Sequence, residues 1–208
     1  MEIKDKSIEV FLDELASKAA TPGGGSAAAL MGAQSAALTS MVCHLTIGKA
    51  KYAAVDLEMK ALLVKSEKLR EELTIMIKED VEVFDRIMAC YRLPKKTDEE
   101  KLKRSEAIQG VLKEATLVPL KCVRACAHAI ALNKIAADKG SLNVISDAGV
   151  GVMSAYAGLK SAALTIYINT GNIKDKTFTE AVLSELDDLL EGIDGITNDI
   201  YQRVKDQL

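Results

Sequence analysis

The chain has 208 residues, a mass of 22.4 kDa and a formal net charge of −3, which allows one domain with a substantial core. Hydrophobic residues make up 49% of the sequence but aromatic residues only 4%, a composition that favours helices packed closely through small side chains. The acidic balance excludes nucleic acid as the main partner, because phosphate binding needs a dominant basic surface. We therefore predict an all-α fold, a single-domain bundle of long antiparallel helices over residues 1–208.

The 4 cysteines show no spacing typical of a disulfide scaffold, so we predict reduced thiols and a cytoplasmic protein. Cys122 and Cys126 are separated by one helical turn, a spacing that suits metal ligands. The nearest histidine, His128, points to another side of that helix. Buried core thiols are therefore the expected role, and we predict no bound metal.

Two long segments carry almost no charge, which raises the question of a membrane-spanning helix. Residues 21–48 contain no Asp, Glu, Lys or Arg, and residues 148–173 contain only Lys160. Polar residues such as Gln34 and His44 interrupt the first segment, and its many alanines favour insertion only weakly. We therefore predict two inner helices of a bundle and no membrane partner.

Hydrophobic spacing predicts helices along the whole chain. The expected ranges are 7–20 with Ser7 as N-cap, 26–46, 53–90, 98–138, a helix capped by Asn143 or Ser146 that ends at Thr170, and 177–205. Pro119 lies inside the fourth helix and removes one backbone hydrogen bond, so we expect a kink or a break there. We find no internal repeat and no low-complexity linker in the sequence.

The sequence Thr-Pro-Gly-Gly-Gly-Ser at residues 21–26 is the most distinctive local feature. Successive glycines cost backbone entropy, so they are expected where the chain turns through positive φ or approaches another group closely. Because a helix follows, the N–H groups of Gly23, Gly24, Gly25 and Ser26 are candidates for contacting a ligand at the helix start. A tight turn between helices is the alternative interpretation.

Two aspartates interrupt hydrophobic patterns. Asp80 falls between Met76 and Phe84 on the inner stripe of the third predicted helix. Burial would raise its pKa and suit it to acid–base chemistry near neutral pH, unless a lysine or arginine pairs with it or it lies at the edge of the stripe. Asp147 stands in the first turn of the fifth predicted helix, where a carboxylate either stabilises the helix start or serves a site.

Basic residues follow two of the predicted helices. Lys49 and Tyr52 come directly after the second helix, and Lys95 comes after the third. Lysines at these positions complement the helix dipole or are simply solvated. They are also suited to hold an anionic part of a substrate.

Several segments together resemble one family. These are residues 21–29, residues 40–49, Tyr52, residues 91–95 (Tyr-Arg-Leu-Pro-Lys) and residues 143–150 (Asn-Val-Ile-Ser-Asp-Ala-Gly-Val). They resemble the cyclodeaminase/cyclohydrolase family, which includes the C-terminal domain of formiminotransferase-cyclodeaminase. The resemblance extends over essentially the whole chain, in order. It implies a helical bundle that forms a homodimer, a folate cleft among the long helices, and no metal or redox cofactor.

The resemblance also implies a reaction and a site. The reaction is hydrolysis of 5,10-methenyltetrahydrofolate to 10-formyltetrahydrofolate. The implied site consists of cleft backbone at Gly23, Gly24, Gly25 and Ser26, a polar substrate-binding lining at Lys49, Tyr52 and Lys95, and a catalytic centre at Asp147, Asp80 and Ser146. His44 departs from the family pattern, because asparagine is expected there.

Two other functions stay open from the sequence. Cyclodeaminase action on 5-formiminotetrahydrofolate, with release of ammonia, would use the same cleft. A non-catalytic helical scaffold that only dimerises would bind no folate, and it would leave Asp80 and the three glycines without a purpose.

Overall fold

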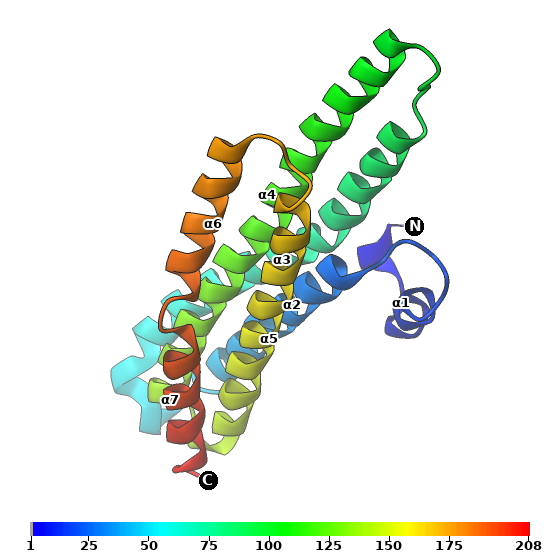
Figure 1. The fold of residues 1–208 in the computed structure, drawn as a ribbon. Coiled ribbons are helices and arrows are strands. Elements are labelled where there is room, and N and C mark those ends of the chain that lie inside the picture. The colour runs from blue at the N-terminus through cyan, green and yellow to red at the C-terminus, as the bar shows by residue number, and fades with distance from the viewer. Residues whose placement is uncertain (1) are drawn as a thin grey trace.

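The computed structural model describes residues 2–208 and confirms the predicted all-α bundle. Four long helices form its body: α2 (Gly24–His44), α3 (Asp56–Tyr91), α4 (Asp98–Lys139) and α5 (Ile145–Thr170). They run antiparallel to their neighbours in the chain, and the upper halves of α3 and α4 extend beyond the others as a two-helix arm (Figure 1). α2 packs against α3, α4 and α5, and α4 also contacts α6 and α7.

The N-terminal segment is separate from the bundle for much of its length. After a short 3-10 turn, Ile3–Asp5, the helix α1 (Ile8–Leu15) projects to the side of the bundle (Figure 1). The predicted N-cap is confirmed, since the Ser7 side chain accepts a hydrogen bond from the backbone N–H of Val10 at 3.3 Å. The helix ends well before residue 20, where the prediction had placed its end, and a loop leads to the glycines.

Small residues bring the inner helices close together, as their composition predicts. A Cβ atom added at Gly32 of α2 would lie 2.8 Å from the sulfur of Cys126 on α4 and from a methyl group of Leu73 on α3. A Cβ added at Gly158 of α5 would lie 2.8 Å from the carbonyl oxygen of Ala28. Any larger residue at these positions would push the helices apart.

The expected break at Pro119 is wrong, because α4 continues through it as one helix. Proline has no N–H for the carbonyl of the residue one turn earlier, which here is Ala115. The side-chain amide of Asn169 on α5 donates to that carbonyl oxygen at 2.9 Å. A neighbouring helix therefore supplies the hydrogen bond that the proline removes, and the helix stays intact.

Two predicted helix ends also need correction. Neither Asn143 nor Ser146 caps α5, since a 3-10 turn, Leu142–Val144, leads directly into it and Val144 is its N-cap. The predicted helix 177–205 is two helices, α6 (Lys176–Leu190) and α7 (Ile193–Lys205). Gly192 separates them with φ at +68°, a left-handed conformation that glycine adopts without a steric penalty.

Two helices contain long apolar segments that belong to the core. By length and composition alone, α2 and α4 are long and apolar enough to cross a membrane, and 61% of the relevant window of each is buried inside the bundle. The cysteines are free thiols as predicted, and Cys43, Cys122 and Cys126 are buried. Burial raises the pKa of the Cys43 thiol to about 12, so this group stays protonated and unreactive.

Candidate active site

The carboxylate of Asp80 lies against the start of α2. The hydroxyl of Ser26 donates to Oδ2 of Asp80 at 2.7 Å. A Cβ atom added at Gly25 would lie only 2.0 Å from Oδ1 of the same carboxylate. Gly25 is therefore glycine because Asp80 occupies the space of a side chain. We call Gly23, Gly24, Gly25, Ser26 and Asp80 the glycine cluster.

This geometry decides between the explanations for the three glycines. Among the described residues only Gly48 and Gly192 have positive φ, so the turn at residues 21–26 does not use left-handed glycine. Gly24 has open space where its Cβ would be, and only Gly25 meets a neighbour closely. Close approach to another group is confirmed for Gly25 alone, and that group is a carboxylate at a helix N-terminus.

Burial raises the pKa of Asp80, and hydrogen bonds from the Ser26 side chain and backbone partly oppose the rise. The alternative that a lysine or arginine pairs with Asp80 is wrong for the described part of the chain, where none of its ion pairs includes this residue. Asp80 is therefore a half-buried carboxylate with one fixed hydroxyl donor and an elevated proton affinity. A carboxyl group in such an environment is a candidate for acid–base chemistry.

The opposite end of α2 carries a second group of polar residues. The backbone N–H of Leu142 donates to the hydroxyl of Tyr52 at 2.9 Å, and Nζ of Lys49 lies 3.4 Å from the hydroxyl of Ser141. The Leu142 N–H bond, together with nearby lysines, lowers the pKa of Tyr52. These contacts join the chain after α2 to the turn before α5.

Ser146 and Asp147 follow that turn, in the first turn of α5. Ser146 is exposed and borders a groove of about 320 Å³ between α5 and α7, whereas Asp147 is half-buried. We call Lys49, Tyr52, Ser146 and Asp147 the lysine cluster. The sequence analysis did not identify Ser141, whose hydroxyl contacts Lys49. Its place in the turn just before α5 was the one feature of the sequence that could have pointed to it.

The structure does not bring the predicted site together within one chain. The glycine cluster and the lysine cluster lie at opposite ends of α2, a helix of 21 residues and so about 30 Å long. Lys95 lies in a third place, the loop between α3 and α4 at the tip of the arm (Figure 1). Asp80 and Asp147 of one chain therefore cannot act on the same carbon atom.

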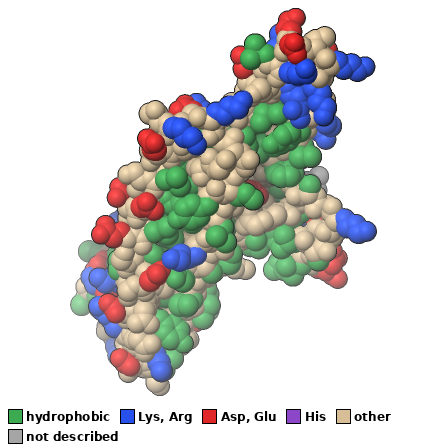
Figure 2. Space-filling model, in the orientation of Figure 1, with side chains coloured by type: hydrophobic (Ala, Val, Ile, Leu, Met, Phe, Trp, Pro, Cys, Tyr) green, Lys and Arg blue, Asp and Glu red, His purple; other side chains and the backbone are tan. Residues whose placement is uncertain are grey.

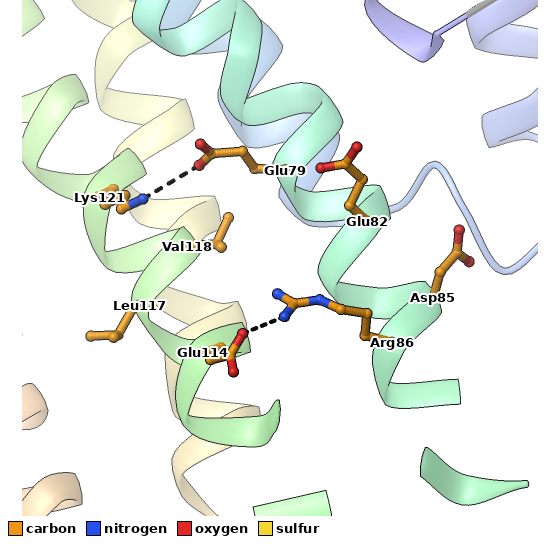
Figure 3. Close-up of a pocket in the computed structure, with 8 residues that line it drawn as sticks. All are labelled: Glu79, Glu82, Asp85, Arg86, Glu114, Leu117, Val118 and Lys121. Carbon is orange, nitrogen blue, oxygen red and sulfur yellow. Dashed lines mark hydrogen bonds and ion pairs between the residues drawn. The ribbon is translucent and has the colours of Figure 1, made fainter. Parts of the chain in front are cut away.

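A charged groove of about 690 Å³, which the sequence reasoning missed, lies between α3 and α4 (Figure 3). Four carboxylates and two basic side chains line it, and Arg86 pairs with Glu114 at 2.5 Å while Lys121 lies 3.6 Å from Glu79. Glu79, which lines the groove, is next to Asp80 in the chain, and the groove is acidic overall. A negative potential of this kind favours a positively charged ligand.

The described residues contain no group of three or more His, Cys, Asp or Glu side chains placed to hold a metal ion. His128 also does not join Cys122 and Cys126 in such a group. The chemistry available at both clusters is therefore that of carboxylates, hydroxyls and lysines.

Comparison with known proteins shows which family the chain matches. The sequence model of the family described as formiminotransferase-cyclodeaminase matches residues 7–188. A methenyltetrahydrofolate cyclohydrolase of Methylorubrum extorquens is 55% identical, and the alignment covers 98% of each chain. A formimidoyltransferase-cyclodeaminase of Rattus norvegicus is 31% identical over 90% of this chain, which spans only 35% of that longer protein.

A solved structure shows the same fold. The crystal structure of a formiminotetrahydrofolate cyclodeaminase from Thermotoga maritima matches 100% of this chain and 98% of its own, with a TM-score of 0.83 and 29% identity. Fold and sequence agree with the segments that carried the resemblance. The chain belongs to the formiminotransferase-cyclodeaminase family.

Proposed function

We propose that this protein hydrolyses 5,10-methenyltetrahydrofolate to 10-formyltetrahydrofolate. The observation that carries the proposal is the 55% identity, over nearly the full length of both chains, to the methenyltetrahydrofolate cyclohydrolase of Methylorubrum extorquens. The half-buried carboxylate of Asp80 beside an acidic groove supports it, because the substrate is a cation delocalised over N5, the bridging carbon and N10.

The reaction requires proton transfers in both directions. Water adds to the bridging carbon and loses one proton to a base, which gives a neutral carbinolamine. The N5–C bond then breaks while N5 gains a proton and the new hydroxyl loses one, so that the formyl group remains on N10. The overall reaction releases one proton, and a carboxylate with an elevated pKa suits both transfers.

The two clusters have complementary roles in this proposal. Asp80 and Asp147 are the carboxylates of the centre, with Ser146 as a polar neighbour of Asp147. The backbone at Gly23–Ser26 borders the bound pterin. Lys49 and Tyr52 hold the anionic glutamate tail of the folate. Lys95 is too far from both clusters, so the proposal does not use it.

We further propose that the protein works in the cytoplasm as a homodimer and uses no metal or redox cofactor. Folate is its only proposed ligand, and neither nucleic acid nor a membrane is a proposed partner.

The direct test is the loss of the methenyl chromophore when the protein is added to 5,10-methenyltetrahydrofolate, with heat-killed protein as the control. Asp147→Asn and Asp80→Asn should each lower turnover while the helical circular dichroism spectrum is unchanged. A wild-type protein that does not accelerate loss of the chromophore would contradict the proposed reaction.

A second function has specific support, because the Thermotoga maritima protein with the same fold is described as a formiminotetrahydrofolate cyclodeaminase. Both reactions add a nucleophile to, or eliminate one from, the same folate carbon. Ammonia release after addition of 5-formiminotetrahydrofolate distinguishes them. Ammonia release at a rate comparable with methenyl hydrolysis would favour the cyclodeaminase.

A further inference from the structure

Lys49 differs from most basic residues of this chain because a buried hydroxyl holds it. Lysine and arginine side chains gather near the tip of the arm formed by α3 and α4, where Lys95 is exposed (Figure 2). A flexible lysine in such a place loses rotamer freedom when it binds an anion. Nζ of Lys49, by contrast, donates to the hydroxyl of Ser141 at 3.4 Å, and Ser141 is only 1% exposed. A lysine that is already held in place binds a carboxylate at a smaller cost in entropy.

Ser141 is itself held against the end of α2. Its backbone N–H donates to Oγ1 of the buried Thr46 at 2.8 Å, and the Thr46 hydroxyl donates to the backbone carbonyl of Val42 at 2.7 Å. The preceding residue is equally close, since a Cβ atom added at Gly140 would lie 2.5 Å from a methyl group of Val42. Ser141 therefore cannot shift without breaking a buried hydrogen bond, and it gives Lys49 a rigid support.

The Tyr52 hydroxyl lies at the same place. It accepts a hydrogen bond from the backbone N–H of Leu142, the next residue of the turn, at 2.9 Å. This bond, the Ser141 hydroxyl and the neighbouring lysines, Lys49 among them, lower the pKa of Tyr52, so the three polar side chains lie close together. A tyrosine oxygen that accepts one hydrogen bond still has its own hydrogen to donate, and a lysine ammonium has three N–H groups. A carboxylate only accepts hydrogen bonds and is complementary to such a pair of donors.

The hydroxyl of Ser141 is not what holds the turn. The backbone N–H groups of Ser141 and Leu142 make the two hydrogen bonds that join the turn to the chain after α2. The side-chain hydroxyl of Ser141 instead contacts the ammonium group of Lys49. Removal of this hydroxyl leaves both backbone bonds in place, so an effect on Lys49 can be separated from an effect on the fold.

We propose that Ser141 is a positioning residue for substrate binding: its hydroxyl holds the ammonium group of Lys49 near the Tyr52 hydroxyl, so that both donors meet one carboxylate of the folate glutamate tail. Thr46 supports this arrangement, because it holds the backbone of Ser141. Ser141 acts through Lys49 and does not touch the substrate. This role rests on the proposed function and extends it to two residues, Thr46 and Ser141, that lie outside the proposed site.

Ser141→Ala tests the role of the hydroxyl with two substrates. KM for 5,10-methenyltetrahydrofolate should rise by about 2- to 10-fold, the change expected for loss of one hydrogen bond, while kcat stays the same. 5,10-Methenyltetrahydropteroate lacks the glutamate and its carboxylates, so its KM should be equal in the variant and the wild type. A general defect in the fold would affect both substrates alike. An unchanged KM for the folate, or equal increases for both substrates, would overturn the proposal.

Action through Lys49 is tested by combining the substitutions. In a Lys49→Ala background, Ser141→Ala should raise KM no further, because the group that it positions is already absent. Increases in KM that multiply in the double variant would show that Ser141 does not act through Lys49.

The support from Thr46 has a matched control in Thr39, which is equally buried and whose hydroxyl donates to the Ser35 carbonyl within α2. Thr46→Val should raise KM for the folate as Ser141→Ala does, whereas Thr39→Val should not. Equal KM values for the two valine variants would contradict the role of Thr46. A wild type without activity would refute the proposed function and this role together. An active wild type with an unaltered KM in Ser141→Ala would refute the role of Ser141 alone.

Discussion

Replacement of Gly25 by alanine tests whether the glycine cluster is organised around Asp80. The new Cβ atom would lie 2.0 Å from Oδ1 and 2.6 Å from Cγ of Asp80, so the carboxylate has to move. Gly24→Ala is the matched control, because nothing lies within 4 Å of the added atom. Both substitutions are in the first turn of α2, and both remove the same backbone freedom from the unfolded chain.

The two substitutions should change the free energy of unfolding in different directions. Alanine gains up to about 1 kcal/mol over glycine in a helix, so Gly24→Ala is expected to be neutral or stabilising. In Gly25→Ala that gain is outweighed by loss of the hydrogen bond from Ser26 to the carboxylate, about 1.5–3 kcal/mol for a charged acceptor. The net destabilisation expected for Gly25→Ala is about 0.5–2 kcal/mol. Its turnover should also fall, because the carboxylate of Asp80 is displaced.

Urea unfolding and the methenyl absorbance assay measure the two effects on the same preparations. If Gly25→Ala were as stable and as active as Gly24→Ala, Asp80 would not be confined by Gly25, and the reasoning about the glycine cluster would be refuted. Equal stability with lower activity would locate the effect in catalysis alone.

Three further predictions follow from other contacts. Burial raises the pKa of folded Asp80, so the stability it contributes is complete below the ordinary carboxyl pKa and is lost as the pH rises through the raised value; urea unfolding measured at increasing pH, starting from the ordinary carboxyl pKa, should show this loss in the wild type but not in Asp80→Asn. Asn169→Ala should lower the free energy of unfolding by about 1–2 kcal/mol, because it leaves the Ala115 carbonyl unpaired. The loss should be much smaller in a Pro119→Ala background, where the helical N–H is restored. Equal losses in both backgrounds would contradict this role of Asn169. Lys49→Ala should raise KM for a polyglutamylated substrate with little change in kcat, and an unchanged KM would remove Lys49 from tail binding.

Much of the fold was accessible from sequence, because the elements that decide it are long and strongly periodic. The helix predicted at residues 53–90 is present as α3 (Asp56–Tyr91), and its stripe at Leu62, Leu69 and Leu73 is buried as expected. The prediction was wrong where a contact distant in sequence decides the outcome. Pro119 does not end the helix, because the side chain of Asn169 donates a hydrogen bond to the carbonyl that the proline leaves without a donor. No local sequence pattern predicts that contact.

The candidate site shows the same division. Asp80 could be identified from the sequence because a charged residue interrupts an apolar stripe. Its carboxylate lies against Gly25, which explains why that position is glycine. Asp80 and Asp147 were predicted to share one centre, but they lie far apart within a chain. The type of a residue and its position on a helix face do not tell which ends of two helices lie together. That information lies in the antiparallel packing of the helices, which depends on contacts between residues far apart in the sequence.

The position of Asp80 also explains how one carboxylate can serve both proton transfers in the proposed reaction. Desolvation holds its pKa above the ordinary range in the free protein. A bound methenyl cation lowers that pKa, because a nearby positive charge favours the ionised form, and the carboxylate is then a base when water attacks. Addition of water neutralises the folate, so the pKa rises again and the carboxylic acid can donate to the departing N5. The charge of the substrate itself thus sets the direction of proton transfer, without movement of the protein.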